Sequence, residues 1–129
     1  MFPANSRLTT LVLGSGAGGG VPQWNCGCRV CRLAWSGDKR VKPRTQAGLA
    51  LTTDGSNWLL LNASIDLRQQ ILATPALHPK GAGRHSPIGA VVLTNAEVDS
   101  SAVARLFSGP SCSCSLSLAI HGANRSSDP

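Results

Sequence analysis

The feature that most constrains this chain is a glycine-rich turn followed at once by three cysteines, GSGAGGGVPQWNCGCRVC, at residues 14–31. Glycine admits the positive φ angles and close backbone approach that other residues resist. Cys26, Cys28 and Cys31 have C-x-C-x2-C spacing, so a curled loop can point three sulfurs at one centre. Thiolates favour zinc and other soft metals, and structural zinc takes four ligands in a tetrahedron. The sequence therefore predicts a metal site that needs a fourth ligand from elsewhere.

Other roles for this stretch stay open at this point. Cysteines also serve as small buried hydrophobic residues, as redox thiols, or as disulfide partners in secreted chains. Cys26 and Cys28 are too close for a relaxed disulfide, and residues 1–20 lack the pattern of a secretory signal. The glycines also match G-x-G-x-x-G, but that dinucleotide fingerprint requires a helix to begin at its last glycine. Residues 20–22, GVP, follow instead, which disfavours a nucleotide site.

Composition and charge narrow the class of protein. The 129 residues suffice for one small domain or part of a larger one, and a hydrophobic content of 42% supports a core. The net charge is +6, with a basic cluster at residues 39–44 that lacks interleaved aromatic residues. We therefore expect a solvated loop there and no nucleic-acid groove. No apolar run approaches the ~20 residues of a membrane span. We expect a cytoplasmic protein with reduced cysteines.

Hydrophobic patterning predicts four strands. We expect a buried strand over residues 8–13, and strands over 45–53 and 58–61 joined through the turn sequence at 53–57. The apolar run at 88–93 predicts a further buried strand. Polar residues follow this last strand, which is where sites form in layered α/β proteins.

Two helical segments and one loop are also expected. A short helical turn is predicted at 31–35. Ser64 is a candidate N-cap for a helix over 65–73. Its apolar positions, expected to face a sheet, are Ile65, Leu67, Ile71 and Leu72. Residues 74–87 are rich in proline and glycine, so we expect an exposed loop in which His78 and His85 are not ligands.

Four segments in order carry a family resemblance. They are LGSGAGGGVPQWNCGCRVC (13–31), RTQAGLALTTDG (44–55), NASIDLRQQI (62–71) and LTNAEVD (93–99). Together they resemble the family of coenzyme PQQ synthesis protein B, PqqB, within the metallo-β-lactamase fold superfamily. The resemblance implies an α/β fold, an α+β sandwich with αββα layers, of which this chain holds a truncated N-terminal portion.

The resemblance also implies a function and partners. PqqB looks like a cytoplasmic participant in making pyrroloquinoline quinone (PQQ), a redox cofactor. One implied role is a metal-dependent oxygenase acting on the tyrosine-derived precursor, and the other is a carrier for PQQ or its precursor. PQQ or a precursor, and other PQQ-biosynthesis proteins, are the implied partners. A third alternative is an inactive truncated fragment, so whether this chain is an enzyme stays open.

Two metal sites follow from the resemblance. It assigns a structural zinc to Cys26, Cys28 and Cys31, with a last ligand, typically a histidine, from far down the chain. The superfamily's active-site motif, H-x-H-x-D-H, falls on residues 95–100 of this chain.

In that motif this sequence has Asn95 and Glu97 in place of the first two histidines, then Asp99. Side-chain oxygen atoms as ligands shift the metal preference of this site away from zinc, and Fe(II) would suit oxygen chemistry. Glu97 and Asp99 are therefore the candidate catalytic residues, with Asn95 as a further metal ligand. The family pattern continues with a histidine, but this chain has Ser100, a poor ligand for such a metal.

The sequence changes in character at this point. Residues 100–129 are rich in serine, poor in charge, and contain the low-complexity run SCSCS at 111–115. We expect residues 8–99 to be the N-terminal part of a metallo-β-lactamase-like domain. We expect residues 100–129 to be a tail foreign to the family, either frameshifted or disordered.

Overall fold

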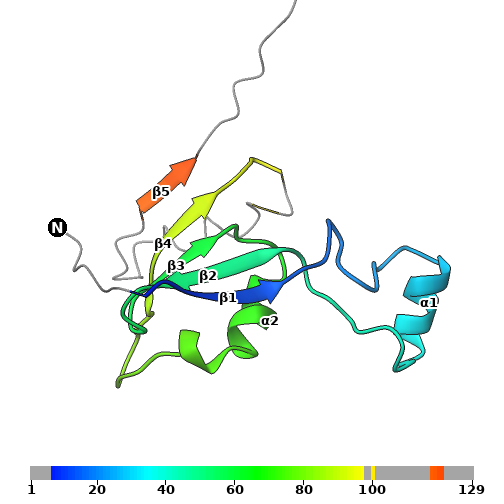
Figure 1. Cartoon of the computed structure of the whole chain (residues 1–129), viewed down its shortest axis with the longest axis horizontal. Helices are drawn as coiled ribbons and strands as arrows, with labels where there is room; N and C mark the ends of the chain where they lie inside the picture. Colours follow the sequence, from blue (N-terminus) through cyan, green and yellow to red (C-terminus); the bar gives the residue numbers. More distant parts are fainter. Residues whose placement is uncertain (1–6, 98–99, 101–116, 121–129) are drawn as a thin grey trace, which may run out of the picture.

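The computed structural model describes residues 7–97, 100 and 117–120. They form a mixed five-stranded sheet in the order β1-β2-β3-β4-β5 (Figure 1). The strands are β1 (Thr9–Gly14), β2 (Gly48–Thr52), β3 (Trp58–Leu61), β4 (Ile88–Leu93) and β5 (Ser117–Ile120). The helices are α1 (Arg29–Trp35), α2 (Leu67–Leu72) and the 3-10 turn η1 (Pro75–Leu77). Within these ranges, no helix has the length and apolar character needed to cross a membrane.

The strand directions bring three separate chain segments to one edge of the sheet. β2 is antiparallel to β1 and to β3, whereas β4 is parallel to β3 and to β5. β1, β3 and β4 therefore run in the same direction. The residues that follow each of these strands leave the sheet at the same edge, the one where the carboxyl ends of the three strands lie. The glycine turn, residues 62–66 and residues 94–97 share this edge, while α1 projects beyond it (Figure 1).

One face of the sheet packs against α2 and η1. Burial alternates along β2, as expected for a strand with a period of two residues. Leu67 of α2 and Leu77 of η1 join the strand side chains in one cluster, whose strand members are Ala50, Trp58, Leu60, Ile88, Val91 and Leu93. The strands predicted over 45–53, 58–61 and 88–93 are thus confirmed, with β2 shorter than its predicted range.

The predicted turn between β2 and β3 is also confirmed. Asp54 Oδ1 accepts hydrogen bonds from the backbone N–H groups of Ser56 and Asn57, both at 2.8 Å. Thr52 Oγ1 accepts the Gly55 N–H at 2.9 Å and donates to the Asn57 carbonyl at 2.7 Å. Gly55 has φ +73°, a conformation that glycine adopts without strain.

The prediction that the first strand is buried was wrong. Val12 in β1 is 67% exposed, and Leu8, which directly precedes the strand, is 61% exposed. In the described part of the chain β1 is an outermost strand of the sheet and pairs only with β2. A run of β-branched and leucine residues predicts a strand, but it carries no information on whether a neighbour covers it.

The start of α2 differs from the prediction as well. Its N-cap residue is Asp66, and Ser64 makes no capping bond. Asp66 itself does not cap the helix, because its Oδ2 accepts the backbone N–H of Gln46 at 2.9 Å. A tertiary contact has therefore taken the side chain that would otherwise bind the first turn.

The buried side of α2 is partly polar. Leu67 and Gln70, three residues apart, are its buried residues, whereas Ile65 and Leu72 are 61% and 58% exposed. The prediction that the last two face the sheet was therefore wrong. Gln70 is buried because its Nε2 donates to the Gln46 carbonyl at 2.7 Å, a bond that satisfies a polar group inside the fold.

The predicted exposed loop at 74–87 contains the η1 turn, which buries Leu77. His85 is exposed, as expected. His78 is half-buried, with its Nε2 2.9 Å from the Ile71 carbonyl oxygen at the end of α2. That contact gives the His78 side chain a structural role.

Candidate functional site

The three cysteines of the glycine–cysteine loop meet in space. The sulfur atoms of Cys26, Cys28 and Cys31 all lie within 4.8 Å of one another. They are free thiols with graded exposure, from exposed Cys28 through half-buried Cys26 to buried Cys31. Sulfurs bound to one tetrahedral zinc lie about 3.8 Å apart, given Zn–S bonds of about 2.3 Å. The three sulfurs are therefore close enough together to bind one metal ion.

Local backbone structure holds the cysteines in this arrangement. Cys28 is the N-cap of α1, and its Sγ accepts the backbone N–H of Cys31 at 3.5 Å. The Cys28 carbonyl accepts the Arg32 N–H at 2.9 Å, which begins the helix. Before the helix, the Cys26 N–H donates to the Gln23 carbonyl at 3.1 Å and closes a tight turn. The predicted helical turn at 31–35 thus begins two residues earlier, with a cysteine as its cap.

Hydrogen bonds give the exposed thiol an acidic character. The Cys31 backbone N–H, and then the neighbouring thiols, lower the pKa of Cys28 to about 7. A hydrogen bond with the Gln23 backbone lowers the pKa of Cys31, but burial and the two neighbouring cysteines outweigh it and raise that pKa overall. Since the thiolate is the form that binds metals, Cys28 is the readiest ligand of the three.

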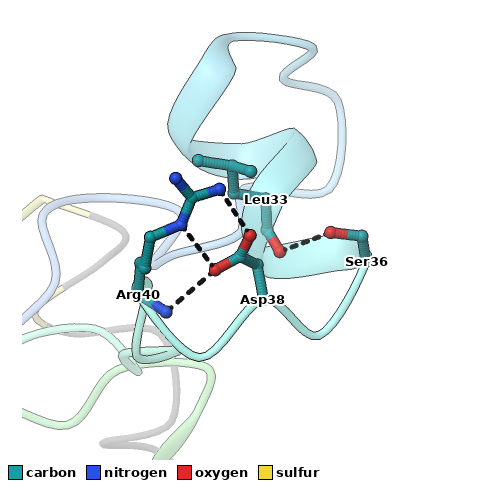
Figure 2. A network of polar contacts seen from close by, with 4 residues as sticks. All are labelled: Leu33, Ser36, Asp38 and Arg40. Atoms are coloured by element: carbon teal, nitrogen blue, oxygen red, sulfur yellow. Dashed lines mark hydrogen bonds and ion pairs between the residues drawn. The ribbon is translucent and has the colours of Figure 1, made fainter.

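A short polar network closes the turn after α1 (Figure 2). Ser36 Oγ donates to the Leu33 carbonyl at 2.9 Å. Arg40 binds the Asp38 carboxylate through its Nε at 3.0 Å and its Nη2 at 2.7 Å. This pairing, with the Arg40 backbone N–H, holds the pKa of Asp38 below its usual value. The helical turn predicted to end at residue 35 does end there, and the chain then returns toward β2.

The glycine turn packs against residues 44–47. Gly16 donates its N–H to the Thr45 carbonyl at 2.7 Å, and Val21 and Arg44 exchange two backbone hydrogen bonds of 2.7 and 2.8 Å. Gly14 sits where the β1–β2 register shifts, and a Cβ there would collide with the Gln46 carbonyl. After the turn the next helix begins only at Arg29, so the dinucleotide fingerprint lacks its helix, as predicted from the sequence.

The polar residues after β4 form a second group at the same edge. The Asn95 side-chain oxygen accepts the Glu97 backbone N–H at 3.0 Å, and both residues are exposed. Asp99, predicted as their companion, lies outside the described residues. Within the described residues, the group of histidine, cysteine and acidic side chains that could hold a metal is the cysteine cluster.

Sequence reasoning missed the residue that ties this edge together. Asn62 adopts φ +67°, and its Oδ1 accepts hydrogen bonds from the backbone N–H and the hydroxyl of Thr94, both at 3.0 Å. These bonds join the ends of β3 and β4. An asparagine directly after a strand is the available signal, because this residue tolerates the left-handed conformation better than most.

Comparison with known proteins decides the family. No family model matches the sequence. The chain is 63% identical over 92 residues to coenzyme PQQ synthesis protein B of Methylobacterium nodulans, covering 71% of this chain and 31% of that protein. It is 64% identical over 102 residues to the protein of the same name from Rhodopseudomonas palustris, strain TIE-1, covering 78% of this chain and 32% of that protein. Over its matched residues, the chain belongs to the PqqB family.

Solved structures agree with this assignment. The crystal structure of Zn(2+)-bound PqqB from Methylobacterium extorquens matches with a TM-score of 0.74 and 43% identity, over 89% of this chain and 46% of that one. The metallo-β-lactamase fold protein YhfI from Bacillus subtilis matches with a TM-score of 0.55 and 17% identity, over 91% of this chain and 37% of that one. At this identity the match supports the fold alone. The expected α/β fold of the metallo-β-lactamase type is thereby confirmed. The chain spans about a third of the length of the curated PqqB relatives it matches.

The structure places Ser100, where the PqqB-family pattern has a histidine, inside the fold. Ser100 is 6% exposed, its carbonyl accepts the Ala63 N–H at 2.7 Å, and its own N–H donates to the Glu97 carbonyl at 3.0 Å. The backbone after β4 is therefore anchored to the end of β3. The serine-rich tail contributes β5, which pairs in parallel with β4.

Proposed function

We propose that this chain takes part in the biosynthesis of PQQ. The observation that carries the proposal is the identity of 63%, over 92 residues, with a protein named coenzyme PQQ synthesis protein B. Because the chain corresponds to about a third of that relative, the activity of the whole protein is inferred here from the part that is shared.

The first element of the proposal is a structural zinc bound by Cys26, Cys28 and Cys31. Support comes from sulfurs within 4.8 Å of one another and from the low pKa of Cys28. The similar PqqB of Methylobacterium extorquens is described as Zn(2+)-bound. Such a zinc would join the loop before α1 to the helix itself, and so would stabilise the lobe that projects from the sheet (Figure 1).

The second element is an active-site metal at the end of β4, with Asn95, Glu97 and Asp99 as ligands and Glu97 and Asp99 as catalytic residues. Carboxylate and amide oxygens suit a harder metal than the thiolates do, so we propose Fe(II). A bound Fe(II) would supply the oxygen chemistry for hydroxylating the tyrosine-derived precursor. The chain's own part is to hold residues 94–97 at the sheet edge through the bonds between Asn62 and Thr94.

A carrier role for PQQ or its precursor is the second candidate. The observation that favours it is the exposed cationic side chains near this edge, Arg44 and Arg68, which could pair with ligand carboxylates. An inactive fragment stays the third alternative. In each case we propose a cytoplasmic location, where the thiols would stay reduced, and contact with other PQQ-biosynthesis proteins.

One experiment separates these alternatives. The chain, loaded with zinc and Fe(II), is incubated with the PQQ precursor and dioxygen, and the products are analysed by mass spectrometry, with Glu97→Gln as the variant and Arg84→Gln as a surface control. An oxygenase adds an oxygen atom to the precursor, and Glu97→Gln abolishes the addition. A carrier retains unmodified precursor on gel filtration. A chain that neither modifies nor retains it contradicts a role in PQQ biosynthesis and leaves the fragment alternative.

A further inference from the structure

The cysteine loop carries a second pattern, which the proposed zinc site does not explain. Cys28 and Cys31 form a C-x-x-C pair in which the first cysteine is the N-cap of α1 and the second lies in its first turn. Residues three apart on a helical turn have Cα atoms about 5 Å apart, within the separation of about 7 Å that a disulfide tolerates. The two sulfur atoms already lie within 4.8 Å of each other. The pair is therefore placed so that a disulfide could join it.

The two thiols differ in their access to solvent. Cys28 is exposed, whereas Cys31 is buried, with 5% of its surface accessible. A small disulfide that approaches the loop therefore meets the sulfur of Cys28 first. The backbone N–H of Cys31 donates to Cys28 Sγ at 3.5 Å, and a hydrogen bond of this kind stabilises the thiolate, the form that attacks a disulfide. Cys28 thus has the properties of an attacking thiol, and Cys31 those of a thiol that reacts only within the chain.

The third sulfur of the cluster is less suited to this pairing. A single residue separates Cys26 from Cys28, which is too short a loop for a relaxed disulfide. The Cys26 N–H donates to the Gln23 carbonyl in the turn before α1, so Cys26 lies outside the helical turn that holds the other two cysteines. Cys31 is therefore the partner for Cys28.

Positive charge adjoins the exposed thiol. Arg29 follows Cys28 directly, and Arg32 comes four residues after it, one turn further along the same side of the helix. Both arginines are exposed, and in the part of the chain that the structure describes the ion pair is that of Arg40 with Asp38. The charges of Arg29 and Arg32 are therefore available to attract an anionic reagent to Cys28.

We propose that Cys28 and Cys31 are a thiol–disulfide exchange pair whose oxidants are small anionic disulfides. The Cys28 thiolate attacks one sulfur of the small disulfide, forms a mixed disulfide with it and releases the other half as a thiolate. The Cys31 thiolate then attacks Cys28 Sγ, closes the bond between the two cysteines and releases the second half. The two protein thiols lose two electrons and two protons, and the small disulfide gains them as it becomes two thiols. The inference goes beyond the proposed function, since it requires neither a metal nor a quinone.

The test uses the full chain with Cys112→Ser and Cys114→Ser, which removes the cysteines outside the described residues. After dialysis against a chelator, the chain is incubated with oxidised glutathione, and the position of any disulfide is mapped by mass spectrometry of its peptides. We expect one disulfide, between Cys28 and Cys31. It should form about fivefold faster with oxidised glutathione than with cystamine, a cationic disulfide, which is the effect of one close pair of unit charges in water. No disulfide, a disulfide through Cys26, or equal rates with the two reagents overturns the proposal.

Single substitutions in this background assign a role to each sulfur. Cys31→Ser should stop the reaction at the first step and keep glutathione on Cys28 as a stable mixed disulfide. Cys28→Ser should lose the reaction, because the remaining thiol of the pair is buried. Cys26→Ser is the matched control and should form the disulfide at the parent's rate. Glutathione on Cys31 in the Cys28→Ser variant would contradict the proposal, and the mapped disulfide of the parent chain decides it if a variant fails to fold.

The result is separable from that of the zinc site, although both use the same sulfurs. A sulfur bound to zinc is not free to attack, so one equivalent of zinc should slow the exchange. A chain that binds no zinc and still forms the disulfide supports this inference and contradicts the structural zinc. A chain that binds zinc and, once stripped of it, forms no disulfide contradicts this inference and leaves the zinc site standing.

Discussion

The backbone N–H of Cys31 points at the sulfur of Cys28, with 3.5 Å between nitrogen and sulfur. This hydrogen bond caps α1, and it is also the largest cause that lowers the pKa of the Cys28 thiol. A helix of seven residues has little stability of its own in water. A metal ion on these sulfurs would add a covalent-strength link between the loop and the helix, so metal binding and the folding of this lobe are expected to be coupled.

The first prediction concerns the buried cysteine. Cys31→Ser removes the most enclosed sulfur of the cluster, so we expect the zinc content of the purified chain to fall from about one per chain to a small fraction of that. Mass spectrometric metal analysis after dialysis measures it. Cys112→Ser, a cysteine outside the described residues, serves as the control and should keep its zinc. Equal zinc contents in the two variants would show that Cys31 is not a zinc ligand.

The second prediction concerns the glycine at the end of β1. In Gly14→Ala the new methyl group would collide with the Gln46 carbonyl and with the side chains of Thr45 and Gln70. We expect a loss of about 1–3 kcal/mol in the free energy of unfolding, measured in urea. Gly89→Ala is the matched control, because a Cβ there meets nothing within 4 Å. A Gly14→Ala variant as stable as Gly89→Ala would contradict the packing described for this turn.

The third prediction concerns the core. Leu60 is fully buried in the centre of the sheet, so Leu60→Ala should lower the free energy of unfolding by about 2–5 kcal/mol. The same substitution at Leu72, which is 58% exposed, should change it by less than about 1 kcal/mol. Urea titrations of both variants make the comparison. Similar losses at the two positions would mean that the face of α2 has been assigned wrongly.

The fourth prediction is a pH dependence. The Asn57 backbone N–H, the Asn57 side chain and the Ser56 backbone N–H hold the pKa of Asp54 well below its usual value. A carboxyl with a depressed pKa in the folded state stabilises the protein above its unfolded pKa, and this stabilisation is lost as the pH falls toward the folded pKa. Asp54→Asn should therefore have a lower Tm than the parent at pH 7, and the difference should shrink below about pH 4. A Tm difference that stays constant down to pH 3 would contradict this role.

Much of the fold could be predicted from the sequence because local signals and tertiary packing agree there. The apolar runs at 58–61 and 88–93 became β3 and β4 with unchanged bounds. The Thr52–Asn57 turn formed as expected, since its Asp54 and Gly55 suit the bonds and the φ angle that the turn needs. The close meeting of the three cysteines also followed from their spacing.

The failures occur where a distant partner decides the outcome. Nothing near Asp66 in the sequence shows that its carboxylate binds the Gln46 backbone, yet that bond removes it as a cap. The burial of Gln70 likewise depends on carbonyl and hydroxyl groups of residues 45–46, about 25 positions earlier. Local patterning treats both residues as helix surface, and so it misplaces the buried side of α2. The roles of Asn95, Glu97 and Asp99 in metal binding remain predictions.

The most direct test of the central claim is X-ray absorption at the zinc edge of the purified chain. The account predicts a first shell with three sulfur atoms at about 2.3 Å and one lighter ligand, and loss of one sulfur in Cys28→Ser. A zinc shell made only of nitrogen and oxygen, or a folded chain that binds no zinc, would contradict it.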